Sequence, residues 1–158
     1  MDEKNKFYMQ RAIQLAKKGM ESDAGGPFGA VVVKDDKIIA EGYNRVTSTN
    51  DPTAHAEIVV IREACEKLNS FQLTDCTLYT SCEPCPMCLG AIYWARPKRV
   101  FYGCSKEDAK AIDFDDQFIY DELDKEIEDR RIPFVQLLRK DALTVFRSWV
   151  QKNDKTVY

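Results

Sequence analysis

Apolar residues in the first third of the chain follow the period of a helix and then that of strands. Across residues 6–20 they recur every three or four positions, which predicts an amphipathic helix. The Gly-Gly-Pro at 25–27 interrupts this pattern. Two runs rich in β-branched and aromatic residues, 28–33 and 38–43, flank the polar turn 34–37, so we expect a hairpin of antiparallel strands.

The rest of the chain alternates between helical and strand patterns. A helix is expected from His55 to residue 68, and Pro86 suits the first position of another that runs to residue 95. Further strands are expected at 76–80, 100–103 and 132–138, and further helices at 114–123 and 141–152. This alternation predicts a layered α/β fold. No repeat or linker-like tract divides residues 1–158, so we expect one domain.

The charge of the chain favours a small-molecule substrate over a polynucleotide. The formal net charge is −3, whereas a nucleic-acid binder gathers phosphates with a positive field. The amino-terminal segment is charged and then amphipathic, without the apolar run that export or membrane insertion needs. We therefore expect a cytoplasmic protein that binds neither nucleic acid nor membrane.

Six cysteines give the first indication of a metal site. With no export signal, thiols kept for a metal or for chemistry are favoured over disulfides. Three of the six, Cys82, Cys85 and Cys88, fall within seven residues. The other three lie among apolar residues and are expected to be core thiols.

A catalytic zinc site uses three nitrogen or sulfur ligands from the protein and leaves the fourth position to water. His55, Cys85 and Cys88 make such a set. If a helix begins at Pro86, the two cysteines lie three positions apart on one face, near backbone amides that favour thiolate over thiol. We predict that these residues bind Zn²⁺.

Hydrolysis at such a metal also needs a group that moves protons, and Glu57 is the candidate. Its carboxylate can accept a proton from water and later protonate a departing amine. Residues two apart on a regular helix point about 200° away from each other. His55 and Glu57 can therefore reach one site only where a helix opens.

The two halves of this set are much more informative together than apart. His-Ala-Glu at 55–57 followed by Pro-Cys-Pro-Met-Cys at 84–88 matches the signature of zinc-dependent nucleobase deaminases. Either half alone is common, because Cys-x-x-Cys also occurs in redox and structural sites. The pairing predicts hydrolytic removal of an exocyclic amino group.

The chain resembles the bacterial guanine deaminases of the cytidine-deaminase-like family over nearly its whole length. The segments that carry this resemblance are 25–30, Asn44, 50–57, 78–88, 90–97 and 114–116. The resemblance implies a three-layer α/β/α fold with a central mixed sheet, zinc on the His/Cys/Cys set and a glutamate proton shuttle. It further implies conversion of guanine to xanthine and ammonia by a homodimer whose carboxyl-terminal segment, about 132–158, can be exchanged between subunits.

The resemblance also implies which residues contact the base. The amide of Asn44 can donate and accept hydrogen bonds, whereas the carboxylate of Asp116 only accepts and so suits the N–H edge of a guanine. Aromatic walls for the ring are expected from Phe28 and Trp94. The remaining expected contacts are Ala56 and, from the exchanged segment, Tyr158.

Several alternatives remain open from the residues alone. Zinc chemistry is indifferent to the ring that carries the amine, so guanosine, cytosine, adenine or a tRNA adenosine could be the substrate. Cys82 as a fourth ligand would close the site into a structural zinc module. Cys82, Cys85 and Cys88 with Cys104 would suit an iron–sulfur cluster, although that reading gives His55 and Glu57 no role.

Overall fold

The computed structural model describes residues 2–158, which form two compact units, one ending at Asp116 and the other beginning at Gln117. The elements of the first unit are α1 (Glu3–Glu21), β1 (Gly29–Lys34), β2 (Lys37–Tyr43), α2 (Val46–Thr49), α3 (Ala56–Leu68), β3 (Thr77–Cys82), α4 (Pro86–Ala95), β4 (Arg99–Cys104) and α5 (Lys106–Lys110). Each helix and strand expected before residue 104 is present, with ends that differ from the expected ones by at most three residues.

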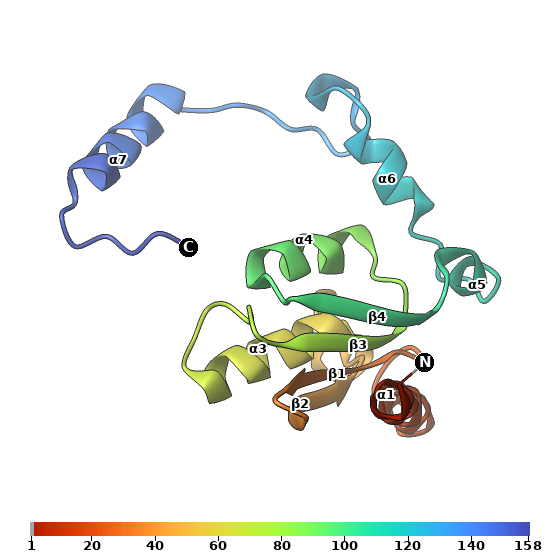
Figure 1. Cartoon of the computed structure of the whole chain (residues 1–158). Helices are drawn as coiled ribbons and strands as arrows, with labels where there is room; N and C mark the ends of the chain where they lie inside the picture. The colour runs from red at the N-terminus through yellow and green to blue at the C-terminus, as the bar shows by residue number, and fades with distance from the viewer. Residues whose placement is uncertain (1) are drawn as a thin grey trace. The chain divides into compact units, whose positions relative to one another are not determined.

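The strands form one mixed sheet in the order β2-β1-β3-β4 (Figure 1). β1 is antiparallel to both β2 and β3, while β3 and β4 are parallel. The hairpin between β1 and β2 turns at Asp35 and Asp36, whose φ angles of 48° and 60° suit the two-residue turn that matches strand twist. The expected antiparallel hairpin is therefore confirmed.

Helices cover both faces of this sheet. On one face α1 packs its apolar stripe, including Tyr8, Ala12 and Leu15, against Val31 and Tyr79 of the strands. On the other face α3 and α4 pack against the strands around a second buried cluster. The members of that cluster are Ala30, Val32, Ala40, Ala56, Val60, Ala64, Leu73, Cys76, Leu78, Ile92 and Ala95. The predicted three-layer α/β/α arrangement is confirmed.

The second unit contains α6 (Gln117–Leu123), a 3₁₀ helix (Ile127–Asp129) and α7 (Arg139–Gln151). The prediction of a strand at 132–138 is wrong for this structure, which has no regular element there. A strand needs a neighbour to pair its backbone groups, and the second unit contains no strand. The helix expected from residue 114 begins three residues later, after Asp113 adopts a φ of 69°.

Burial tests the expectation that three of the cysteines lie in the core. Of the three cysteines expected in the core, Cys76 is buried, Cys65 is half-buried and Cys104 is exposed on β4 at the sheet edge, so the expectation was wrong for Cys104.

Among residues 2–158, no helix has the length and apolar character needed to cross a bilayer.

Gly29 sets how closely α1 can approach the sheet. A Cβ at this position would lie 2.3 Å from the carbonyl oxygen of Ala12 and 2.5 Å from the amide nitrogen of Ala16, and both are backbone atoms of α1. Neither can move without shifting the helix. By contrast, a Cβ on Gly90, which is exposed on α4, meets no atom within 4 Å.

We predict that Gly29→Ala lowers the free energy of unfolding by roughly 3 kcal/mol, at the upper end of overpacking effects. The matched substitution Gly90→Ala should raise it by about 0.5–1 kcal/mol, because alanine loses less backbone entropy than glycine in a helix. Urea unfolding followed by circular dichroism measures both. Wild-type stability of Gly29→Ala would contradict the close approach of α1 to β1.

Candidate active site

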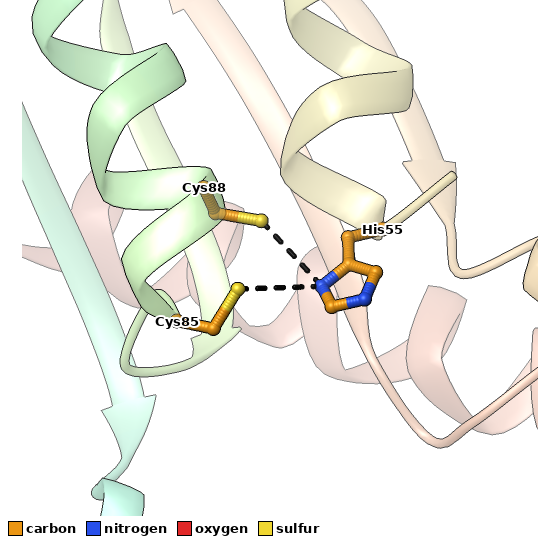
Figure 2. Close-up of side chains that lie close together, drawn as sticks. All are labelled: His55, Cys85 and Cys88. Carbon is orange, nitrogen blue, oxygen red and sulfur yellow. Dashed lines mark hydrogen bonds between the residues drawn. The ribbon is translucent and has the colours of Figure 1, made fainter. Parts of the chain in front are cut away.

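Three potential metal ligands converge from the first residues of two helices. His55 is the residue before α3, and Cys85 is the residue before α4, whose first position is Pro86. Cys88 lies in the first turn of α4 and is fully buried. Figure 2 shows the three side chains pointing toward one another from the two helix starts.

The geometry of this cluster fits a tetrahedral zinc ion. Nδ1 of His55 lies 3.6 Å from Sγ of Cys85 and 3.6 Å from Sγ of Cys88. All three ligand atoms lie within 4.8 Å of one another. Zinc bonds of ordinary length to nitrogen and sulfur, meeting at the tetrahedral angle, place these atoms about 3.6 Å apart. The donor set and the spacing therefore both fit zinc.

Hydrogen bonding within the cluster favours one thiolate. A hydrogen bond from Cys88 lowers the pKa of Cys85 to about 4, with His55 contributing in the same direction. The same sharing of a proton raises the pKa of Cys88, and the hydrogen bond to Cys85 raises the pKa of His55. Metal binding then has to displace the proton that Cys88 retains.

Glu57 lies on the side of the cluster next to Cys88. Its side chain is buried, and burial raises the pKa of its carboxyl. Oε2 lies 3.5 Å from Sγ of Cys88, while Oε1 accepts a hydrogen bond of 2.8 Å from the hydroxyl of Thr80 on β3. His55 has extended backbone angles, φ −66° and ψ 155°, so it is not on the helix that carries Glu57. The two side chains can therefore face one region.

Asn44 is a buried polar residue directly after β2. Its backbone N–H donates to the carbonyl of Phe28 at 2.9 Å, and its Oδ1 accepts from the N–H of Val46 at 3.0 Å. A Cβ on Gly25 would lie 2.1 Å from this Oδ1, so a glycine is needed beside the amide. Because Oδ1 is engaged locally, any hydrogen bond that Asn44 donates must come from its amide nitrogen.

Phe28 is half-buried and packs against a second aromatic side chain. Its ring packs edge-on against the ring of Phe114, with the ring centroids 4.9 Å apart and an angle of 88° between the ring planes. A Cβ on Gly26 would contact both rings. Sequence reasoning placed Phe114 in a motif but gave it no role. Ala56, the other contact expected in this part of the chain, is fully buried at the first position of α3, where backbone N–H groups lack partners within the helix.

The remaining expected contacts differ in where the structure places them. Asp116 is half-exposed at the end of the first unit; partial burial raises the pKa of its carboxyl, and the charge of Cys85 adds to this. Trp94 is 63% exposed and lies six residues beyond Cys88 on α4, so its position in this chain gives its predicted role no support. Tyr158 belongs to the second unit and is exposed.

Cys82 does not belong to the ligand cluster. Its thiol is buried, contacts the carbonyl of Ser105 at 3.6 Å, and has a pKa raised to about 11 by burial. Neither it nor Cys104 lies in the metal-ligand group found among residues 2–158. The structural-zinc and iron–sulfur alternatives both needed Cys82, and this geometry removes it from the ligand set.

A network of hydrogen bonds that sequence reasoning missed supports the loop carrying Cys85. The N–H of Glu83 donates to the carbonyl of Cys104 at 2.8 Å. The Glu83 carboxylate accepts from the N–H of Lys106 at 3.1 Å. The only sequence feature that could have indicated a role for Glu83 is its position in the motif, two residues before Cys85. The contacts depend on β3 and β4 lying side by side.

Comparisons with known proteins agree with this arrangement. Residues 2–104 match the model of the cytidine and deoxycytidylate deaminase zinc-binding region. The chain is 57% identical to the guanine deaminase of Bacillus subtilis over 151 residues, which cover 96% of this chain and 97% of that one. The X-ray structure of guanine deaminase from Bacillus subtilis aligns with a TM-score of 0.94 and 56% identity, covering 97% of this chain and 98% of that one.

A second group of relatives matches less of the chain. The tRNA-specific adenosine deaminase of Buchnera aphidicola is 41% identical over 107 residues, which cover 68% of this chain and 70% of that one. Because the match to the Bacillus enzyme leaves only seven of 158 residues outside, it must include most of the second unit. Taken with the His55, Cys85 and Cys88 cluster, the family match shows that the chain belongs to the cytidine and deoxycytidylate deaminase family of zinc-dependent enzymes.

Proposed function

We propose that the protein is a hydrolase that converts guanine and water to xanthine and ammonia. The observation that carries the chemistry is the three-ligand cluster with zinc spacing beside a buried glutamate. Three protein ligands leave one tetrahedral position open, as a catalytic zinc site requires. Similarity to a guanine deaminase over 96% of the chain supports guanine as the substrate.

In this proposal His55, Cys85 and Cys88 hold the zinc ion. When bound, zinc supplies a water molecule whose pKa is lowered from near 16 to about 7. Glu57 would take a proton from water through Oε2, the oxygen that faces Cys88. It would deliver this proton to a ring nitrogen, take a second proton from the hydroxyl newly bonded to C2, and pass that second proton to the departing amine. A C–O bond forms at C2 of the guanine, the bond from C2 to the amino nitrogen breaks, and ammonia leaves.

Other residues orient the base for this step. The free amide nitrogen of Asn44 donates to a ring acceptor, and Asp116 accepts from an N–H of the guanine edge. The edge-packed rings of Phe28 and Phe114 provide an apolar wall. Ala56 contributes its backbone at the start of α3. Trp94 is assigned no contact with the base in this proposal, because it is largely exposed in this chain.

The tRNA adenosine deaminase alternative is less well supported. Matches to tRNA deaminases cover 61% to 76% of this chain, whereas the match to the guanine deaminase covers 96% and so includes most of residues 117–158. The net charge of −3 also disfavours a polynucleotide substrate.

We also propose a cytoplasmic location. The thiolate ligands need a reducing environment, and all six cysteines are free.

We further propose a homodimer in which the carboxyl-terminal segment, about 132–158, is exchanged between subunits, so that residues 1–158 act as one deaminase domain. No residue from Gln117 to Tyr158 is buried in the single chain. On α7 the large apolar side chains of Val145, Phe146, Trp149 and Val150 are exposed. In the first unit, the outer edge of β4 pairs with no described strand. A second copy covers such surfaces, and its Tyr158 would then close the site.

The proposed reaction predicts ammonia release from guanine by zinc-replete protein. A panel of guanine, guanosine, adenine, cytosine, cytidine and an adenosine-containing tRNA anticodon stem-loop tests the substrate. Glu57→Gln should lower turnover at least about 10³-fold by removing the proton shuttle, while zinc content and the unfolding midpoint stay near wild type. Turnover of a different panel member alone would contradict guanine as the substrate, and an active Glu57→Gln would contradict the shuttle.

Exchange of the segment predicts complementation between two inactive chains. A chain ending at Val150 should keep its zinc, because the ligands lie in the first unit, but lose at least about tenfold in guanine turnover. Co-expression with full-length Glu57→Gln should restore about a quarter of the wild-type rate, since half of randomly paired dimers contain one complete site. Full activity and an unchanged oligomeric state of the truncated chain alone, or no recovery on co-expression, would contradict the exchange.

A further inference from the structure

The carboxylate of Glu57 is held by a residue to which the reaction described above assigns no role. The hydroxyl of Thr80 donates to Oε1 of Glu57 at 2.8 Å, and both side chains are buried. Oε2, the other oxygen, lies 3.5 Å from Sγ of Cys88. The two oxygens of one carboxylate therefore face different partners, one on the sheet and one in the ligand cluster.

Thr80 is placed to act as a rigid support. It lies in β3, an inner strand, and pairs with Ala30 of β1 on one side and Tyr102 of β4 on the other. Its relative exposure is 0%. Threonine is β-branched and so has few rotamers in a strand. The direction of its hydroxyl is consequently fixed by the sheet and not by the loops around the site.

We propose that Thr80 is a positioning residue that occupies Oε1 of Glu57 and so leaves Oε2 as the oxygen that moves protons. This inference rests on the proposed function, because it assigns the proton-transfer step to one atom of the proposed shuttle. A carboxylate attached by a flexible side chain can rotate and exchange its two oxygens. The Thr80 hydrogen bond restricts that freedom and favours the orientation in which Oε2 lies beside the ligand cluster.

A hydroxyl on the same strand provides a matched control. Ser81, the next residue, is also buried, but its Oγ accepts a hydrogen bond from the backbone N–H of Gly29 at 3.0 Å. Successive side chains of a strand point to opposite faces, so this hydroxyl lies away from Glu57. Ser81→Ala therefore removes a buried hydrogen bond of β3 without touching the carboxylate.

The experiment compares Thr80→Val, Thr80→Ser and Ser81→Ala with the wild type for kcat, KM, zinc content and unfolding midpoint. Valine matches the shape of threonine but cannot donate, so Thr80→Val should lower kcat about 10- to 100-fold with KM and zinc content within twofold of wild type. Thr80→Ser keeps the hydroxyl and should lie within about threefold of wild-type kcat. Ser81→Ala should lower the unfolding midpoint and leave kcat nearly unchanged.

A crystal structure of zinc-loaded Thr80→Val gives a readout that does not depend on activity. The Glu57 carboxylate should be rotated or disordered there and unchanged in Thr80→Ser. A carboxylate that keeps its position in Thr80→Val, or equal losses of kcat in Thr80→Val and Ser81→Ala, would overturn the proposal. If the wild type proves inactive on guanine, the proposed substrate fails, while the carboxylate position still decides the role of Thr80.

Discussion

The two 3.6 Å separations between Nδ1 of His55 and the sulfurs of Cys85 and Cys88 determine what the site can do. They require the first residues of α3 and of α4 to lie close together over one face of the sheet. At a helix start, unpartnered backbone N–H groups and the helix dipole favour negative charge, which suits a thiolate such as that of Cys85. Closeness of the two helix starts therefore supplies both the geometry and the electrostatics of a zinc site.

The sheet holds these helix starts in place through apolar packing. Val60 of α3 and Ile92 of α4 belong to one buried cluster with Val32 and Leu78 of the central strands. The same inner strand, β3, carries Thr80 under the Glu57 carboxylate and leads into the loop that carries Cys85. In the proposed mechanism, packing, proton transfer and metal binding thus depend on one strand and the two helices above it.

Much of this arrangement could be predicted because it is encoded locally. The period of apolar residues gave α1 and the hairpin, and Pro86 gave the start of α4. The proposed ligand set followed from residue chemistry and motif spacing, and the structure places its three side chains together. That the side chain of Glu57 faces the cluster could be inferred only once His55 was known to precede the helix. The angle of about 200° between side chains two residues apart on a regular helix argued against it.

What could not be predicted depends on contacts between distant segments. The Thr80 hydroxyl meets Glu57 through the packing of α3 on β3, which no local pattern reveals. The segment 132–138 has the composition of a strand, but a strand forms only beside a partner, and its own unit offers none. Exposure of Trp94 reflects the rotation of α4 over the six residues after Cys88.

The central claim is a zinc site with three protein ligands and one open position. X-ray absorption at the zinc edge of the purified wild-type protein tests it directly. The account predicts two sulfur neighbours at about 2.3 Å and two nitrogen or oxygen neighbours at about 2.0–2.1 Å, one from His55 and one from solvent. Three sulfur neighbours would mean that Cys82 closes the site, and would contradict a catalytic role for the metal.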